Sequence, residues 1–367
     1  MRIEKVKFDC RHFKGHIPCK PNKEKGLQCD ACNAYTPIEK RILIIKLGAI
    51  GDVIRTTPLV VRYRKMYPDC RITWLTHSPA VLPKDMVDEV LAFDFASAFA
   101  VQHRKYDIAV NLDKEVEACS LLAAVDAKEK YGYTWDTKSN HISPATPAAE
   151  HKLLTGLFDG LSKANTKHYL DEIFEICHLK FDDEPYLISY NRQLAAKFDF
   201  IKEKAAGKKI VGLNTGCGAR WKTRLWSQEY WEKLVSLLAK DGYFPMLLGG
   251  AAEHELNEAM SKASGAFYPG HFSLEEFIAL TSTCDVVVTQ VSMMMHIATA
   301  LQKPMALMNN IFNAHEFYLY NRGVIVQPAT GCDCYYGTAC KRARPCMLDI
   351  APETMLNAVR QLSVTKK

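Results

Sequence analysis

The chain has 367 residues, of which 48% are hydrophobic and 24% charged, a balance typical of a globular protein of two or three domains. This composition excludes a disordered or collagen-like chain, and no apolar run is long enough for a transmembrane helix. The formal net charge is +6 with its positive excess at both ends, which indicates either an anionic partner (membrane surface, phosphorylated glycan, nucleic acid) or solvated termini. Because the N-terminus lacks the apolar core of a signal peptide, we expect a cytoplasmic protein.

Residues 1–40 are poor in apolar side chains and cannot bury enough surface to fold by hydrophobic contacts alone. They hold four cysteines: Cys10, Cys19, Cys29 and Cys32. Four thiolates complete a tetrahedral shell around zinc or iron, and disulfides are rare in the cytosol. We therefore predict one structural metal ion on these cysteines, with His12 and His16 as substitute ligands and free or oxidised thiols as the alternative.

Alternating strands and helices follow this segment. The apolar run 41–46 predicts a strand buried on both faces of a parallel sheet, residues 53–66 predict the next helix, and residues 134–150 predict a loop. Asp52 follows a glycine-bearing turn, where a carboxylate serves either as a helix N-cap or as a general base at the floor of a cleft. The further elements expected in this half are strands at 71–76 and 106–111 and helices at 115–125, 151–163 and 168–179.

The alternation restarts near residue 209, after a linker at 181–190. The elements expected there are strands at 210–215, 244–248, 286–289 and 304–308 and helices at 228–240, 253–262, 274–282 and 292–301. Each half thus opens with a strand, a glycine turn and a helix, which predicts two doubly wound α/β domains in tandem. Because such sheets bind ligands at the carboxyl ends of their strands, we expect a site in a cleft between the halves.

The second half contains candidate contacts for a nucleotide. Arg220, Lys222 and Arg224 follow a glycine turn and precede a helix, as a diphosphate site requires; a solvated basic loop is the alternative. Glu253 follows a Gly-Gly turn, where it either accepts hydrogen bonds from a ribose diol or serves as a first-turn helix charge. His296 opens an apolar helix, either as a site residue or as a buried core histidine.

Residues 42–58 resemble the opening motif of glycosyltransferase family 9, the bacterial ADP-heptose heptosyltransferases. Further motifs occur in the family's order at 214–216, 224–227, 249–253 and 292–304, so the resemblance covers roughly residues 41–362. It implies the GT-B fold, with two Rossmann-like domains facing a cleft, and inverting transfer from an ADP-sugar. The domains implied are 1–40, a cysteine-rich metal-binding segment; 41–190, an N-terminal acceptor domain; 191–350, a C-terminal nucleotide-sugar domain; and 351–367, a C-terminal helix and tail that cross back.

The resemblance assigns roles to several residues. Asp52 matches the general base that deprotonates the acceptor hydroxyl, and Glu253 matches the acidic residue that contacts the adenosine ribose. The residues implied around the diphosphate are Thr215, Gly216, Lys222 and Arg224.

One family motif, Asp-Ser/Thr-Gly-x-x-His, is incomplete. Ser292 and His296 remain, but Val291 and Met293 stand where the family has Asp and Gly. Because the family Asp contacts the transferred sugar, a replacement carboxylate is needed, and Asp113 at the end of a predicted strand is the candidate; a solvated helix-start charge is its alternative. The broken motif also leaves open a second function, a nucleotide-sugar-binding scaffold with weakened catalysis.

The cysteine-rich N-terminal segment resembles the iron finger of the autotransporter heptosyltransferases, a subset of the family. A second group near the other end comprises Cys332, Cys334, Cys340 and Cys346, at spacings that suit another metal knuckle. Zinc and iron both remain open, and no catalytic metal is expected. The partners expected are an ADP-sugar donor, an anionic lipopolysaccharide-core glycan or a protein as acceptor, and the inner-membrane surface as a peripheral contact. No nucleic acid is expected, and the oligomeric state is left open.

Overall fold

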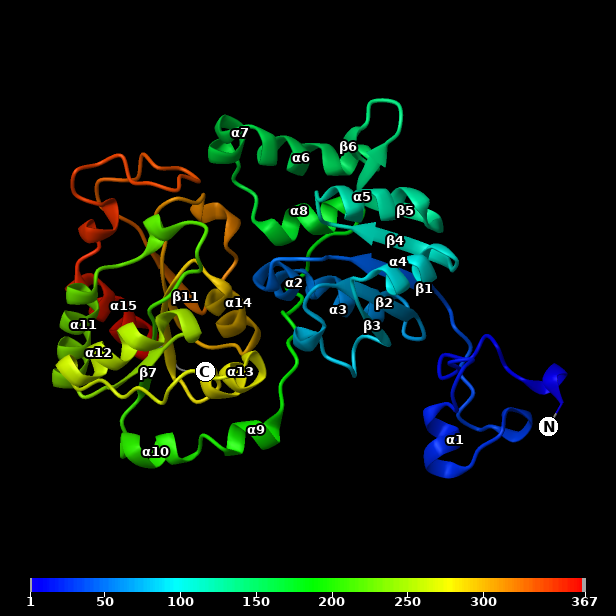
Figure 1. Ribbon diagram of the computed structural model, residues 1–367, viewed down its shortest axis with the longest axis horizontal. Helices are drawn as coiled ribbons and strands as arrows, with labels where there is room; N and C mark the ends of the chain where they lie inside the picture. Colours follow the sequence, from blue (N-terminus) through cyan, green and yellow to red (C-terminus); the bar gives the residue numbers. More distant parts are fainter. Residues whose placement is uncertain (1, 365–367) are drawn as a thin grey trace. The chain divides into compact units, whose positions relative to one another are not determined.

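The computed structural model describes residues 2–364 (Figure 1). Contacts between residues divide the chain into two compact units, each with its own sheet. Unit 1 comprises Met1–Gly48, Thr57–Leu153 and Ile173–Glu184. Unit 2 comprises Ala49–Thr56, Leu154–Glu172 and Pro185–Lys367. The units are therefore interleaved in sequence, and the four domain boundaries expected from the sequence stay predictions.

Unit 1 contains a six-stranded sheet in the order β3-β2-β1-β4-β5-β6. Its strands are β1 (Arg41–Ile45), β2 (Arg71–Thr76), β3 (Glu89–Ala92), β4 (Lys105–Asn111), β5 (Asp126–Asp136) and β6 (His141–Pro144). β1 pairs in parallel with β2 and β4, and residues 42–45 are fully buried, as the apolar run predicted. The loop expected at 134–150 is wrong in part, because β6 pairs antiparallel with β5. The polar residues there belong to a partly exposed edge hairpin that turns through Asn140, whose φ is 54°.

The helix expected at 53–66 is interrupted at Pro58, which has no backbone N–H and starts a new helix. The segment therefore forms α2 (Ile50–Thr56), which belongs to unit 2, and α3 (Pro58–Met66), which belongs to unit 1. The other helices of unit 1 are α1 (Lys20–Lys25), α4 (Phe95–Gln102), α5 (Val116–Ala124), η1 (Ile3–Lys5), η2 (Cys29–Ala31), η3 (Pro79–Val81) and η4 (Pro147–Ala149). Two helices contain residues of both units: α6 (Glu150–Leu157) and α8 (Tyr169–Ile176).

Unit 2 contains a five-stranded parallel sheet in the order β11-β10-β9-β7-β8. Its strands are β7 (Ile210–Asn214), β8 (Phe244–Leu248), β9 (Val286–Gln290), β10 (Met305–Met308) and β11 (Gly323–Val326). Its remaining helices are α7 (Asp159–Ala164), α9 (Arg192–Ala196), α10 (Phe200–Ala205), α11 (Gln228–Lys240), α12 (His254–Ser264), α13 (Leu274–Thr281), α14 (Met293–Ala300), α15 (Pro352–Val364), η5 (Lys222–Arg224), η6 (Ala251–Glu253), η7 (Ala314–Glu316) and η8 (Cys346–Asp349). The two sheets with their alternating helices confirm the predicted pair of α/β domains.

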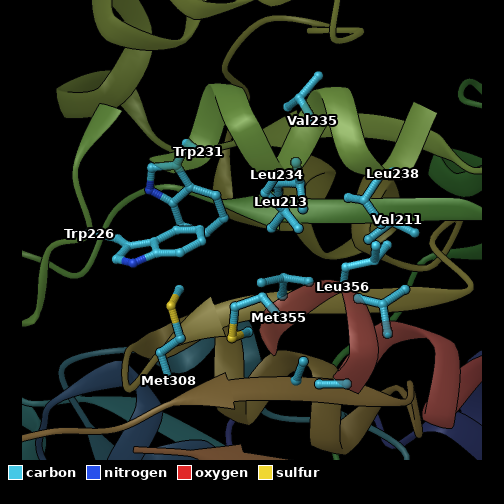
Figure 2. Close-up of a cluster of buried hydrophobic side chains, with 14 of the residues drawn as sticks. Val211, Leu213, Trp226, Trp231, Leu234, Val235, Leu238, Met308, Met355 and Leu356 are labelled. Atoms are coloured by element: carbon cyan, nitrogen blue, oxygen red, sulfur yellow. The ribbon is translucent and has the colours of Figure 1, made fainter. Parts of the chain in front are cut away.

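The core of unit 2 anchors the loop that follows β7 (Figure 2). Trp226 and Trp231 pack edge to face with ring centroids 5.0 Å apart, and Nε1 of Trp226 donates to the carbonyl of Ile350 at 3.0 Å. Ser227 accepts a hydrogen bond from the backbone N–H of Tyr230 and so caps α11. Further side chains of this core are Val211, Leu213, Leu234, Leu238, Met355 and Leu356. Because Trp226 is buried here, the preceding η5 is held at the carboxyl end of β7.

The longest helices, α11 and α15, have 13 residues each. Across residues 2–364, no helix combines the length and the apolar composition needed to cross a bilayer. α15 packs against α11 and against β9, β10 and β11 of its own unit, and its buried side chains belong to the core of that unit. The predicted crossing of this helix and tail stays a prediction.

Candidate active site

A cavity of about 710 Å3 opens at the carboxyl ends of β7, β8 and β9, and all its lining residues belong to unit 2. This is the edge at which parallel α/β sheets bind ligands. It brings together six residues that the sequence singled out: Asp52, Gly216, Arg224, Glu253, Ser292 and His296. Four others are not among the lining residues in the described part of the chain: Thr215, Arg220, Lys222 and Asp113.

Asp52 lies in the first turn of α2, on the wall of this cavity. Its Oδ2 accepts a hydrogen bond from the backbone N–H of Ala49 at 3.3 Å, and its Oδ1 lies 2.8 Å from Nε of Arg55. The side chain is 34% exposed, so an acceptor hydroxyl has access to it. Asp52 is therefore not the N-cap weighed as an alternative from the sequence, since it lies inside the helix and accepts the N–H of the residue before it. Its exposed carboxylate remains able to take a proton.

Gly51 allows α2 to approach α14 closely. A Cβ atom at Gly51 would lie 2.5 Å from Cδ2 of His296, so only glycine fits without displacement. His296 is buried, and its Nδ1 has no hydrogen-bond partner among the described residues. Burial, assisted by the charge of Arg55, lowers the pKa of His296 to about 3. The imidazole on the cavity wall is therefore neutral at physiological pH.

Arg224 is a buried cation on the cavity wall. Its Nε donates to the carbonyl of Trp221 at 3.2 Å, and its two terminal nitrogens donate to the carbonyls of Val291 and Cys217. Within residues 2–364 it pairs with no carboxylate, and burial lowers its pKa. Its guanidinium also lies over the rings of Trp221 and Phe312. A nearby anion stabilises a buried cation that has carbonyl and aromatic partners, so this position suits a diphosphate.

Glu253 and Gly216 form the opposite part of the wall. Oε2 of Glu253 accepts a hydrogen bond from the backbone N–H of Gly250 at 3.0 Å, which fixes the carboxylate at the end of η6. A Cβ atom at Gly216 would overlap this carboxyl group. The glycine therefore lets the loops after β7 and β8 meet, and it leaves the carboxylate facing the cavity, where it can accept hydrogen bonds from hydroxyl groups.

Thr215 and Lys222 point elsewhere. Thr215 is buried, and its hydroxyl donates to Oδ1 of Asn257 at 2.8 Å. Its neighbours Asn214 and Gly216 line the cavity instead, because consecutive side chains of an extended chain face opposite sides. Lys222 lies on η5 with an exposed side chain.

Ser292 precedes α14 at the N-cap position but makes no capping hydrogen bond. Its hydroxyl lies 3.2 Å from the hydroxyl of Thr289 and 3.4 Å from the amide nitrogen of Asn214. Val291 lines the cavity beside it, so this stretch of the wall is apolar where a carboxylate would be expected from the motif.

Asp113 belongs to unit 1, just beyond β4. It is buried, with one carboxylate oxygen paired to Nζ of Lys46 and the other accepting the backbone N–H of Leu47. It is therefore not a solvated helix-start charge. Both oxygens hold groups at the end of β1, which gives the residue a structural role in unit 1.

The cavity wall also contains residues that the sequence did not assign. They are Arg55, Trp221, Phe312, Glu316 and Tyr336. Arg55 lies three residues after Asp52, a spacing that places helical side chains side by side, so the sequence held a signal for it. Tyr336 comes from the loop between the C-terminal cysteines, and its backbone carbonyl accepts a hydrogen bond from Nε1 of Trp221 at 3.2 Å. No local sequence pattern predicts this contact between Trp221 and Tyr336.

The two cysteine groups lie in different units. Cys10, Cys19, Cys29 and Cys32 line one small cavity of about 30 Å3 in unit 1, together with His12. In unit 2 the sulfurs of Cys332 and Cys346 are 3.6 Å apart, and the backbone N–H of Cys334 donates to the sulfur of Cys332 at 3.3 Å. Hydrogen bonds from the backbone of Arg342 lower the pKa of the Cys340 thiol.

All thirteen cysteines are free thiols. Four thiols around one cavity are the donor set that zinc and iron prefer. In the part of the chain that the structure describes, however, no three His, Cys, Asp or Glu side chains converge on a common point as metal ligands. The donor chemistry fits a metal ion, while the side-chain positions are not those of a closed site.

Known proteins resemble this chain in sequence and in fold. Residues 96–308 match the family model described as glycosyltransferase family 9 (heptosyltransferase). Lipooligosaccharide heptosyltransferase 2 of Haemophilus influenzae is 25% identical over 299 residues, which cover 72% of this chain and 81% of that protein. The structure of a family 9 glycosyl transferase from Veillonella parvula superposes with a TM-score of 0.68 at 18% identity, covering 89% of this chain and 97% of that one. The dodecameric iron-containing heptosyltransferase TibC, in complex with ADP-D-beta-D-heptose, gives 0.56 at 13% identity, over 88% and 76% of the two chains.

Proposed function

The chain belongs to glycosyltransferase family 9 and is a transferase, and we propose that it moves a heptose or similar sugar from an ADP-sugar to an acceptor hydroxyl with inversion. The acceptor class we propose is an anionic lipopolysaccharide-core glycan or a protein. One observation carries the proposal: a single cavity holds an accessible carboxylate, Asp52, and a buried cation without a carboxylate partner in residues 2–364, Arg224. These are the two groups that a displacement with a diphosphate leaving group requires.

The reaction is a single displacement at the anomeric carbon. The acceptor hydroxyl attacks this carbon while Asp52 takes the hydroxyl proton. The bond to the diphosphate breaks, and the negative charge that develops on the leaving ADP lies beside Arg224. Because Arg224 is already held by three backbone carbonyls, it needs no rearrangement to stabilise this charge. Glu253 accepts hydrogen bonds from the ribose hydroxyls, and the neutral His296 adds no competing charge next to the base.

The cysteine groups are proposed to hold structural zinc or iron ions. Cys10, Cys19, Cys29 and Cys32 would bind the ion of unit 1, and the group of Cys332, Cys334, Cys340 and Cys346 that of unit 2. A bound ion supplies cross-links between loops and takes no part in the transfer. In unit 2 such a cross-link would steady Tyr336, which lies between two of these cysteines and contributes to the cavity wall.

A second candidate function is a nucleotide-sugar-binding scaffold without efficient transfer. Val291 favours it, since an apolar side chain lines the cavity where the family motif has a carboxylate. Both candidates bind the donor, and only the transferase releases ADP faster when an acceptor is added.

We propose a position on the cytoplasmic side, peripheral to the inner membrane, where a lipid-linked acceptor is reached. The dodecameric assembly of TibC supports the proposal that this chain also forms an oligomer.

The test measures ADP release from ADP-heptose with and without acid-hydrolysed lipopolysaccharide or a protein acceptor. We expect acceptor-dependent release by the wild type and about 10²–10⁴-fold less by Asp52→Asn. This variant should keep ADP binding and stability, because the amide oxygen of Asn can also accept the N–H of Ala49. Asp199→Asn is the matched control, since this exposed aspartate at the start of α10 also pairs with the basic residue three positions later, Lys202, but does not line the cavity. Donor binding without acceptor-dependent release would favour the scaffold, and near-normal turnover by Asp52→Asn would show that Asp52 is not the general base.

A further inference from the structure

Three charged side chains of unit 2 form a row on the cavity wall, and only Asp52 has a role so far. Arg55 follows it by one turn of α2, and the guanidinium Nε lies 2.8 Å from Oδ1 of Asp52. The terminal NH1 of the same group donates to Oε1 of Glu316, on η7, at 3.2 Å. The row is negative, positive, negative, and all three residues line the cavity.

The guanidinium of Arg55 is held in one orientation. Its central carbon lies 3.5 Å from the ring centroid of Tyr169, on α8, so one planar face is covered by an aromatic ring. Its NH1 donates to Glu316, its Nε forms an ion pair with Asp52 without a hydrogen bond, and its side chain is only 16% exposed. A planar group with a covered face and two occupied edges cannot rotate without losing these contacts. The side chain is thus a fixed support for Asp52.

The titratable side chains that interact with this row include His296 of α14, Tyr169 of α8, Tyr186 of the segment before α9 and Tyr336 of the cysteine loop. Burial lowers the pKa of His296 to about 3 and raises the pKa of Tyr186 and of Tyr336, so these three are uncharged near neutral pH. Burial opposes the charge of Arg55, but its interactions with Asp52, Tyr169, Glu316 and Tyr186 together outweigh burial and raise the pKa of Arg55, which stays charged.

We propose that Arg55 is a positioning residue that aims the carboxylate of Asp52 at the acceptor hydroxyl, and that Glu316 restrains Arg55 and moderates its pull on that carboxylate. This proposal rests on the proposed function of Asp52 as the general base. A guanidinium beside a carboxylate favours its ionised form, which keeps the base ready but weakens it as a proton acceptor. Glu316 shares the same cation, so Asp52 retains more basicity than it would beside an unshared arginine.

Arg55 and Glu316 therefore shift the pKa of Asp52 in opposite directions. A merely structural role of these residues would not shift this pKa, so the shift tests the proposal. Without the charge of Arg55, Asp52 would bind its proton at a higher pH. Without the charge of Glu316, the unshared cation would keep Asp52 ionised to a lower pH. The reaction needs the unprotonated carboxylate. The acid limb of the pH profile of kcat/KM therefore shifts up without Arg55 and down without Glu316.

The experiment compares pH profiles of kcat/KM for the wild type, Arg55→Gln and Glu316→Gln. We expect the acid limb of Arg55→Gln to move up by about one pH unit or more and that of Glu316→Gln to move down. The kcat of Arg55→Gln should also fall on the order of 10- to 100-fold, because the base is no longer aimed, whereas the KM for the donor stays near the wild-type value. Arg55→Lys keeps the charge without the planar fork, so we expect it to restore the limb but not kcat.

Arg360→Gln is the matched control. It removes the two hydrogen bonds that Arg360 donates to Asp241 of the same unit, at 2.8 and 2.6 Å, away from the cavity lining. We expect no shift of its acid limb. Unshifted limbs in folded Arg55→Gln and Glu316→Gln, with Asp52→Asn inactive, would overturn this proposal alone, and Glu316→Gln decides if Arg55→Gln does not fold. An active Asp52→Asn would instead overturn the role of Asp52 in the proposed function.

Discussion

Replacing Gly51 by alanine tests whether the close approach of α2 and α14 sets the position of the base. The new Cβ would lie 2.5 Å from Cδ2 and 3.2 Å from Nε2 of His296, so the helices must separate by roughly 0.5–1 Å to restore van der Waals contact. The imidazole of His296 has little room to move, because it is buried and stacks on the ring of Tyr186, with the ring centroids 6.2 Å apart and the ring planes at 19°. Overpacking of this kind costs about 1–3 kcal/mol, partly offset by about 1 kcal/mol from the better helix propensity of alanine.

The consequence for catalysis should exceed that for stability. Asp52 is the next residue on α2, and a displacement of about 1 Å in a reacting group lowers the rate on the order of 100-fold. The assays are denaturant unfolding and kcat for ADP release, in the wild type and in the His296→Ala background. With the ring removed, we expect Gly51→Ala to stabilise the protein rather than destabilise it, which reverses the sign of its effect.

Gly160→Ala provides the control for helix propensity, since that glycine of α7 has open space around its Cβ position. It should stabilise the protein by about 0.5–1 kcal/mol and leave kcat unchanged. If Gly51→Ala destabilises the protein equally with and without the His296 ring, the packing explanation is refuted.

Three further predictions concern the nucleotide, the metal and the pH dependence. Arg224→Ala should weaken ADP binding by about 1.5–3 kcal/mol in calorimetry, whereas Arg220→Ala, an exposed neighbour, should not; equal affinities would refute the diphosphate assignment. Elemental analysis should find stoichiometric zinc or iron, and Cys29→Ser/Cys32→Ser should lose the ion of unit 1; a wild type without metal contradicts the proposed sites. Burial lowers the pKa of His296 to about 3 in the folded protein. In the unfolded chain the same imidazole is protonated below about pH 6.5, so between these two pH values only the unfolded state binds the proton. The free energy of unfolding should therefore fall as the pH drops from about 6.5 toward 3, and His296→Gln should flatten this dependence; equal pH dependence in both proteins contradicts the assignment.

Several features of the fold were predictable because they depend on local patterns. The apolar run of β1 could only be satisfied by burial on both faces, and the repeated order of strand, glycine turn and helix indicated two α/β domains. The interruption of the first helix was also readable in principle, since Pro58 lacks the N–H that a continuous helix needs. The hairpin of β5 and β6 was not, because its polar residues resemble a loop unless the sheet edge beside them is known.

The candidate site was partly predictable for the same reason. Motifs after strands singled out Asp52 in the first half and Arg224 and Glu253 in the second, and the cavity contains all three. The direction in which each of these side chains points was not predictable from the motifs. Thr215 lies in the same motif but turns to Asn257, because the alternation of an extended chain allows only every second side chain to face the cavity.

The sequence by itself thus determined the two α/β halves, the family, and the residue types at the strand ends, since these depend on periodicity and short motifs. Only the tertiary structure decided which charges meet. Arg55 and Glu316 are 261 positions apart, and no spacing in the chain relates them. They pair because α2 packs on α14 through Gly51 and because η7 reaches the same wall of the cavity. A pairing of this kind is a property of how helices and loops pack, and packing depends on contacts between distant parts of the chain.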